Sequence, residues 1–446
     1  MEHAVNAGRP RPLAHSDTGL DLPYRQSHSR CLAAAIGAGG LTDPQFAAAL
    51  GQTAPILEEL RRQRTSLPLF AGVDRRDDLP AVAEIAARFR GFNDVLVFGT
   101  GGSSLGGRTL TALASVARPR LWFLDNLDAD SFAARLEGVD LRATGILVLS
   151  KSGTTAEVMA QLGAALPRLR AVLGDRPGSH VVGLADPGDN PLRRIGGAFG
   201  FPVLDHDPGI GGRFSALSAT GVLPAMIAGI DVAALRRGAA RVLDRTLAGP
   251  GAPPAIGAAL NAAFLSHRGL RQVVLMVYAD RLDPFAQWFR QLWAESLGKS
   301  GKGSTPVSAL GPLDQHSQLQ LYLDGPDDKL FTVVTVAAAG TGPIITEPLK
   351  GEPAFAALAG RSIGDLVEAE QRATVAALAK RGRPVRVIHV PRLDEAALGG
   401  LLMHFMLETM IVAGLWGVEA FGQPAVEEGK ALALRFLAEG FSADWP

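Results

Sequence analysis

The pattern of hydrophobic positions divides the chain into apolar runs and amphipathic segments that alternate. Short continuous apolar runs predict strands that are buried on both faces. These runs cover residues 94–98, 121–125, 146–150, 180–185, 273–278, 331–336 and 385–390. Helical segments separate them, at residues 104–116, 128–136, 154–172 and 284–297. This alternation predicts an α/β fold, with parallel sheets covered by helices on both faces.

The same pattern predicts how the chain is divided into parts. Further helices are expected at residues 41–64, 80–90, from about 254 to 264, 394–417 and 426–438. A run of glycine and proline at 249–254 marks a boundary between two α/β domains. We therefore expect a leader (1–40), a first domain (41–230), a second domain (254–410) and a helical C-terminal segment (411–446).

Composition narrows the class of protein and its surroundings. The 446 residues carry 44 basic and 44 acidic side chains, so no charge bias points to nucleic acid or to an anionic membrane. The single cysteine, Cys31, excludes an intramolecular disulfide and suits a reducing cytoplasm. We expect no membrane span, because no apolar run of about 18 residues stands out, and no signal peptide, because the N-terminus is polar.

A glycine-rich turn follows the first predicted strand. Residues 99–106 read GTGGSSLG and open a helix at the carboxyl edge of the sheet, where α/β proteins bind ligands. The glycines let backbone N–H groups converge, and a helix N-terminus attracts an anion. A dinucleotide fingerprint fits poorly, because the spacing differs and Ser103 and Ser104 point to hydroxyl ligands. A structural turn without a ligand is the alternative.

A second turn, at residues 150–155, reads SKSGTT and follows the third predicted strand. It brings four hydroxyls and Lys151 to the start of a helix, where the helix dipole also favours an anion. A plain N-cap explains one or two of these hydroxyls, but not all four together with the lysine. Only seven of the 44 basic residues are lysines, which favours a specific use for this one. The turn predicts a phosphate site.

A carboxylate stands at the end of an aromatic helix. Between Phe285 and Trp293, apolar residues recur at helical spacing and form one stripe. Glu295 borders this stripe one turn after Gln291, so it is sheltered yet able to face a cleft. A loop with three glycines and two lysines follows. This arrangement suits a general base beside an anionic substrate; a solvated surface glutamate is the alternative.

Three further residues have chemistry that fits a catalytic site. Arg213 sits on a glycine turn, GIGGRFS, and could stabilise a developing oxyanion. His316 lies among hydrogen-bonding side chains in GPLDQHSQ and suits acid–base catalysis, although a lone histidine is more often structural. Lys430 lies about one turn into the last helix, where a solvent-facing lysine is the simpler interpretation.

Six motifs, in their order along the chain, resemble the glucose-6-phosphate isomerase (phosphoglucose isomerase) family in its compact bacterial form. They read GTGGSSLG, SKSGTT, GGRFS, QLWAESLGKSGKG, DQHSQ and QPAVEEGK, and the similarity runs from about residue 94 to the end. The first two motifs alone mark only sugar-phosphate-binding SIS domains. The resemblance implies two three-layer αβα SIS-type domains with parallel sheets, plus a helical C-terminal segment.

The resemblance also implies roles for the matching residues. Glu295 matches the base that moves a proton between C2 and C1, and Arg213 matches an arginine near the enediolate oxygens. His316 and Lys430 match the pair linked to opening of the sugar ring. Residues that match substrate or phosphate contacts are Gln291, Gln423, Gly102, Ser103, Ser150, Lys151, Ser152 and Thr155. In this family the site forms between subunits, which implies a homodimer with His316 contributed across the interface.

The activity that this resemblance implies is interconversion of D-glucose 6-phosphate and D-fructose 6-phosphate through a cis-enediol. It needs neither a metal nor a nicotinamide, and the sequence has no HExxH motif and no dinucleotide fingerprint. Two alternatives stay open: an isomerase that also accepts mannose 6-phosphate, and a non-catalytic sugar-phosphate-binding protein. An aminotransferase of the glucosamine-phosphate type is disfavoured, because no N-terminal cysteine nucleophile is present.

Overall fold

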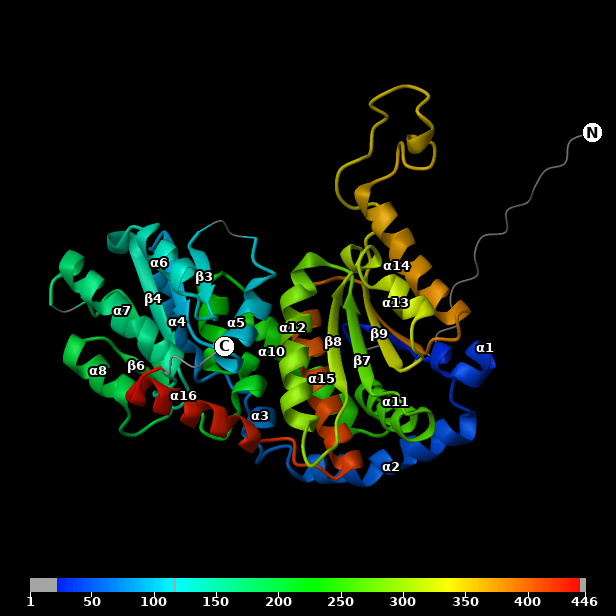
Figure 1. Ribbon diagram of the computed structural model, residues 1–446, viewed down its shortest axis with the longest axis horizontal. Helices are drawn as coiled ribbons and strands as arrows, with labels where there is room; N and C mark the ends of the chain where they lie inside the picture. The colour runs from blue at the N-terminus through cyan, green and yellow to red at the C-terminus, as the bar shows by residue number, and fades with distance from the viewer. Residues whose placement is uncertain (1–21, 116–117, 176, 442–446) are drawn as a thin grey trace, which may run out of the picture.

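The computed structural model describes residues 22–115, 118–175 and 177–441, and it contains two five-stranded sheets that lie side by side (Figure 1). All strand pairs of the first sheet are parallel. Its order is β3 (Arg120–Leu124), β2 (Asp94–Phe98), β4 (Thr144–Leu149), β5 (Val181–Ala185) and β6 (Val203–Asp205). The strands β2, β4 and β5 are wholly buried, as their continuous apolar runs predict.

The second sheet is parallel except for one edge strand. Its order is β1 (Arg25–Ser27), β10 (Val385–Val390), β9 (Lys329–Val336), β7 (Gln272–Val277) and β8 (Thr305–Leu310). The short β1 is antiparallel to β10, and the register pairs Arg25 with His389. Both sheets together confirm the predicted parallel α/β architecture.

Helices cover both faces of the two sheets. Those that follow the strands of the first sheet are α5 (Gly102–Thr111), α6 (Ala129–Glu137), α7 (Ala156–Leu173) and α8 (Pro191–Phe199), with α4 (Leu79–Phe89) before it and η4 (Gly212–Leu217), α9 (Ala219–Ile227) and α10 (Val232–Leu247) after it. The second sheet has α11 (Pro253–Arg268), α12 (Asp283–Leu297), α13 (Leu319–Asp324), α14 (Ile363–Lys380) and α15 (Glu395–Trp416). The chain closes with η8 (Pro424–Val426) and α16 (Glu427–Glu439).

The central helix α15 is mostly apolar and has no polar face, with His404 and Glu408 as buried exceptions, and a helix of that kind has to be buried all round. Residues 397–413 are all buried. By length and composition α15 could cross a membrane, and 94% of its most apolar 18-residue window is buried inside the protein. We expected no apolar run of this length from the sequence, and that expectation is wrong.

The start of the described chain makes contacts with elements of both halves of the protein. The helix α2 (Asp43–Arg62) begins after the N-cap residue Thr42, which forms a capping box with Gln45. Its first half packs in one apolar cluster with α11, and its Ile56 lies against Gly414 of α15. The first half of α2 therefore packs with a helix of the second sheet, while its Leu57 and Leu60 join the large apolar cluster that also contains strands of the first sheet. The described part of the leader supplies β1 to the second sheet.

Candidate active site

Glu295 lies near the end of α12, on the side that faces the first sheet's turns. The apolar stripe of this helix is buried, and the indole of Trp288 donates to the carbonyl oxygen of Arg213 at 3.0 Å. The Glu295 side chain is 30% exposed. One of its oxygens, Oε1, accepts a hydrogen bond from Gln291 Nε2 at 3.0 Å. The predicted shelter and spacing of these two residues are both present.

Arg213, on η4, connects three separate parts of the chain. It donates from Nη1 to Glu295 Oε2 at 3.2 Å and to Gln423 Oε1 at 2.9 Å, and from Nε to Ser296 Oγ at 2.8 Å. Its Nη2 donates to the carbonyls of residues 420 and 422. Burial lowers the pKa of Arg213 and the Glu295 carboxylate opposes that shift, but an arginine stays charged in either case. A buried cation therefore lies beside the carboxylate.

The backbone of the glycine-rich turn after β2 lies in close contact with the backbone of residues 212 and 213. A Cβ atom added at Gly102 would lie 2.2 Å from the backbone carbon of Gly212, so no larger residue fits there. Gly101 has a φ of +55°, and a Cβ added to it would meet Gln291 Nε2 at 3.0 Å. The Ser215 hydroxyl lies 3.3 Å from the carbonyl oxygen of Gly102. Close backbone approach therefore explains these glycines.

The two serines of this turn point to different surroundings. Ser104 is buried and donates to Asp125 Oδ2 at 3.0 Å, so its hydroxyl braces α5 and is not a ligand for an anion. That part of the prediction is wrong. Ser103 is half-buried within the turn.

The hydroxyl groups of the SKSGTT turn form hydrogen bonds with one another. Ser150 Oγ and Thr155 Oγ1 are 2.8 Å apart, and Ser152 Oγ accepts from the hydroxyl of Thr154 at 2.7 Å. Thr155 is the N-cap of α7, and its own side chain makes no capping hydrogen bond. The first backbone N–H groups of α7 are thus left to face an anion.

Lys151 joins this turn to the arginine turn. Its Nζ donates to the carbonyls of Pro208 and Ile210, at 2.9 and 3.1 Å. Ile210 lies three residues before Arg213, so the ammonium fixes the approach to the arginine. An ammonium has three N–H donors, which leaves one for a bound phosphate.

An ion pair of a buried arginine supports the far end of η4. Arg236 is 1% exposed and forms a bidentate pair with Asp78, at 2.7 and 2.6 Å. It also donates to the carbonyl of Leu217, the last residue of η4. The turn that carries Arg213 is therefore held at both ends, by Lys151 and by Arg236.

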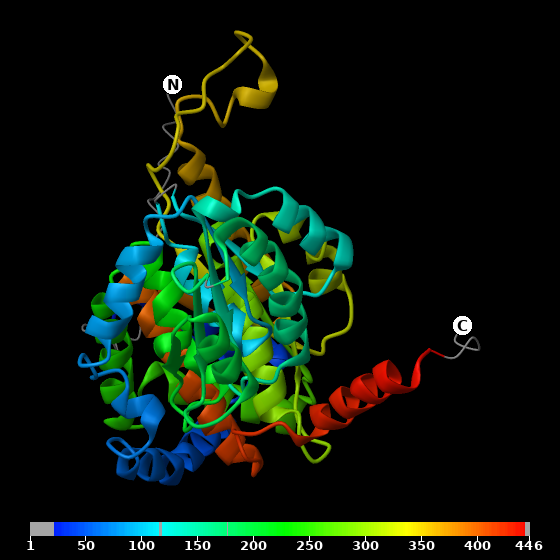
Figure 2. The ribbon, with the colours of Figure 1, turned by 90° about the vertical axis from the view of Figure 1, so that its left-hand side faces the viewer.

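Two predicted site residues lie away from this cluster. His316 follows η6 (Leu313–Gln315) at the carboxyl end of β8 and is exposed. Lys430 lies on α16, is exposed, and pairs with Glu427 at 2.8 Å. Figure 2 shows α16 projecting away from the body of the protein. One copy of the chain thus brings together Glu295, Arg213 and Gln423, but not His316 or Lys430.

Two contacts of the cluster were not predicted from the sequence. Ser296 is buried and accepts from Arg213, and its only signal was its place next to Glu295. The main-chain carbonyls of residues 420 and 422 carry no side-chain signal at all. Only the tertiary structure reveals them.

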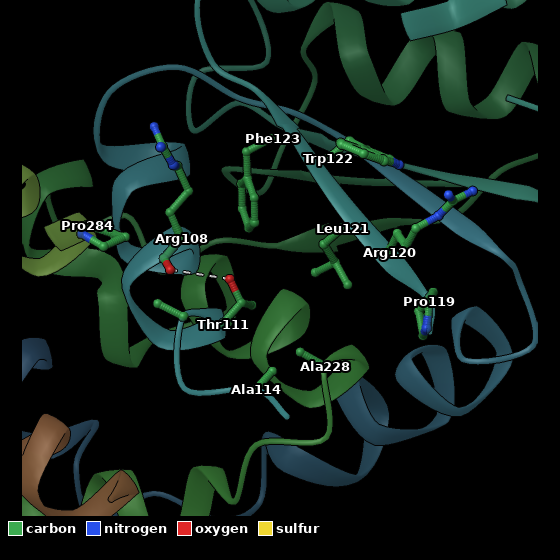
Figure 3. A pocket seen from close by; sticks show the side chains of 11 residues that line it. Arg108, Thr111, Ala114, Pro119, Arg120, Leu121, Trp122, Phe123, Ala228 and Pro284 are labelled. Atoms are coloured by element: carbon green, nitrogen blue, oxygen red, sulfur yellow. Dashed lines mark hydrogen bonds between the residues drawn. The ribbon is translucent and has the colours of Figure 1, made fainter. Parts of the chain in front are cut away.

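A pocket of about 390 Å³ lies elsewhere, between β3, the end of α5 and the start of α12 (Figure 3). Apolar side chains line most of it, together with Arg108 and Arg120. These two arginines are paired with Asp125 and Asp94. None of the predicted site residues lines this pocket, so we place the candidate active site at Glu295, where the polar groups converge.

Comparison with known proteins decides the family. The sequence model of "Phosphoglucose isomerase" matches residues 83–310, half of the chain. A glucose-6-phosphate isomerase of Rubrobacter xylanophilus is 39% identical over 371 residues, which are 80% of this chain and 86% of that protein. The chain belongs to the phosphoglucose isomerase family.

Solved structures agree with this family assignment. A hypothetical protein of Thermus thermophilus superposes with a TM-score of 0.83 at 35% identity, covering 93% of this chain and all of the other. A glucose-6-phosphate isomerase of Chlamydia trachomatis has a TM-score of 0.77 at 21% identity, covering 95% of this chain and 90% of the other. The predicted SIS-type α/β fold of the phosphoglucose isomerase family is confirmed.

Proposed function

We propose that this protein interconverts D-glucose 6-phosphate and D-fructose 6-phosphate, the activity named for its relatives. One observation carries the proposal: the half-buried carboxylate of Glu295 lies 3.2 Å from the buried guanidinium of Arg213. Isomerisation of an aldose to a ketose needs a base that moves a proton between adjacent carbons. It also needs a fixed positive group for the oxyanion that forms on the way. This pair supplies both.

The phosphate of the substrate would bind where the first sheet's turns meet. The open N-terminus of α7 and the third N–H of Lys151 face the same edge of the sheet as the glycine turn at 99–102. The hydroxyls of Ser150, Ser152 and Thr155 complete this cradle. Because the cradle binds the part of the sugar that does not react, it fixes the position of C1 and C2.

Proton transfer would then take place at Glu295. Its carboxylate removes the proton from C2, Arg213 stabilises the negative charge of the enediolate, and Glu295 returns the proton to C1. Gln291 and Gln423 each bond to this pair and would orient the sugar hydroxyls. Positioned acid–base catalysis of this kind contributes about 10²–10⁴-fold to a rate.

Ring opening would need His316 and Lys430, and topology argues against a site built by one copy alone. The helix α12 starts at the carboxyl end of β7, so Glu295 near its end lies by the amino end of the parallel strand β8. His316 follows the carboxyl end of β8. Six strand residues separate the two ends by roughly 20 Å. A second copy is therefore proposed to supply His316.

The exposed apolar side chains of the C-terminal helix α16 also support a homodimer. The described residues of this helix are all half-exposed or exposed, and three of its large apolar side chains are exposed: Leu434, Phe436 and Leu437. Exposed apolar surface of this kind marks contact sites. Packing of α16 against a partner would also bring Lys430 towards an active site.

A coupled assay tests the proposed activity. Fructose 6-phosphate is supplied, and glucose 6-phosphate is followed through its oxidation by a dehydrogenase. Turnover with and without a chelator is expected to be equal, because no step above uses a metal. Binding of hexose 6-phosphate without turnover would favour the non-catalytic alternative. A parallel assay with mannose 6-phosphate as the substrate tests whether the enzyme also isomerises that sugar. The cytoplasmic location stays a prediction.

A further inference from the structure

The connection between α15 and η8 passes between two cations. The carbonyls of residues 419 and 421 accept hydrogen bonds from Lys299 Nζ, at 2.5 and 2.6 Å. The carbonyls of residues 420 and 422 accept from Arg213 Nη2, at 2.7 and 2.9 Å. Four successive carbonyls thus alternate between the two cations. Carbonyls in an irregular connection need such partners, because no helix or strand satisfies them.

Lys299 is largely enclosed in this place. Its side chain is 15% exposed, and the Glu419 carboxylate lies 3.8 Å from its Nζ. Two of its three N–H groups are already used by carbonyls. The neighbouring Lys302 differs, because it is exposed and donates to a single carbonyl, that of Trp416, at 2.6 Å. The two lysines therefore lie in one loop but differ in exposure and in the number of carbonyls that they bind. Lys302 can serve as a control for Lys299.

The segment that Lys299 holds leads directly into the candidate site. Gln423 is the next residue, and its Oε1 accepts from Arg213 Nη1 at 2.9 Å. Phe421 packs its ring against Phe214, which follows Arg213, with 5.2 Å between ring centroids. The helix that carries Lys430 begins four residues after Gln423. The position of residues 419–422 therefore sets where both side chains can lie.

We propose that Lys299 is a positioning residue of the isomerase site. Through the carbonyls of residues 419 and 421 it fixes Gln423, and the start of the helix that bears Lys430, relative to Arg213 and Glu295. Lys299 acts through the backbone and does not contact the phosphate or the sugar. This inference rests on the proposed function and adds to it a residue outside the reacting groups.

Three variants of the full chain test it: Lys299→Met, which keeps the length of the side chain without its charge, Lys299→Arg, and the control Lys302→Met. We expect Lys299→Met to lower kcat by about 10- to 100-fold, since small displacements in an active site have effects of that size. Lys302→Met is expected to stay within about twofold, as exposed contacts contribute little. Lys299→Arg is expected to recover part of the loss, because a guanidinium can also donate to two carbonyls.

Two further measurements separate positioning from other roles. Binding of sorbitol 6-phosphate, a reduced open-chain hexose phosphate that cannot isomerise, is expected to change by less than about threefold in Lys299→Met, since the phosphate cradle is untouched. Hydrogen exchange is expected to become faster over residues 417–430 and to stay unchanged elsewhere.

Several outcomes would overturn the inference. A dissociation constant that rises as much as kcat falls would make Lys299 a substrate ligand. Faster exchange over the whole chain would make it a general structural residue, and equal kcat values for Lys299→Met and Lys302→Met would leave it no role. If the unmodified protein fails to isomerise hexose phosphates, the proposed function fails instead. Hydrogen exchange then still tests whether Lys299 holds residues 419–422 in place.

Discussion

Arg213 and Glu295 lie 3.2 Å apart although 82 residues separate them in the chain. The arginine comes from a turn beside the first sheet, and the glutamate from a helix of the second. Their contact therefore exists only when the two halves are packed together. The candidate site depends on that packing as much as on the two side chains.

Replacing the proposed base tests the proton transfer directly. Glu295→Gln keeps the size of the side chain and its bond to Gln291 but removes the carboxylate. We expect exchange of the C2 proton with labelled water to vanish, with kcat reduced by about 10²–10⁴-fold. Sorbitol 6-phosphate should still bind, because the phosphate cradle is intact. Retained exchange would mean that another group is the base.

Mixing two inactive variants tests whether the site is shared between copies. Glu295→Gln and His316→Ala each lose activity alone. If subunits exchange, each mixed dimer contains one site with both residues intact, so an equal mixture should regain about a quarter of full activity. Lack of any recovery, with subunit exchange verified by mass, would place both residues in one chain's site.

A buried ion pair in the second half is expected to control stability. Arg386 and Glu408 are each 1% exposed and bond at 2.6 Å, and Arg386 also donates to Thr332. Arg386→Met would leave a buried carboxylate without its cation, which costs about 3–5 kcal/mol. The control is Arg372→Met, an exposed arginine that pairs with the half-buried Glu368, for which less than about 1 kcal/mol is expected. Urea unfolding measures both, and equal shifts of the midpoint would contradict this ranking.

The same network should make stability depend on pH. His404 is fully buried, between the hydroxyl of Tyr24 at 2.7 Å and Glu408 at 2.9 Å. Burial lowers the pKa of His404 below its ordinary value of 6.5, although Glu408 opposes the shift. The unfolded chain therefore binds the proton more readily. The stability that the neutral, buried His404 contributes is complete above pH 6.5. It is lost as the pH falls from there towards the folded-state pKa of His404.

Unfolding midpoints measured from about pH 8 to pH 5 check this dependence. His404→Gln is expected to be less stable at every pH. Its free energy of unfolding should also fall less steeply as the pH is lowered, because its unfolding takes up fewer protons, by up to about one. His267→Gln, at an exposed histidine, is the control and should keep the dependence of the unmodified protein. His28 and His206 also have a pKa that burial lowers, so part of the dependence persists. An unchanged slope in His404→Gln would contradict the prediction.

The local pattern was enough to predict most of the regular structure. Continuous apolar runs gave β2, β4, β5, β7, β9 and β10, because a strand buried on both faces needs apolar residues throughout. The edge strand β8 was missed, since its sequence TPVSAL contains a proline and is only half-buried. The strand β1 was missed because it has three residues and exists only by pairing with β10.

The sequence by itself determined the α/β fold, the two glycine- and hydroxyl-rich turns and the identity of Glu295 as a sheltered carboxylate. Each of these depends on neighbours along the chain. The tertiary structure decided that Ser104 bonds to Asp125, that Lys151 and Lys299 bind main-chain carbonyls, and that His316 follows the carboxyl end of β8, a strand parallel to the one that α12 follows. Backbone carbonyls have no signature in the sequence, and the distance between two elements follows from their packing, so no local pattern could reveal these contacts.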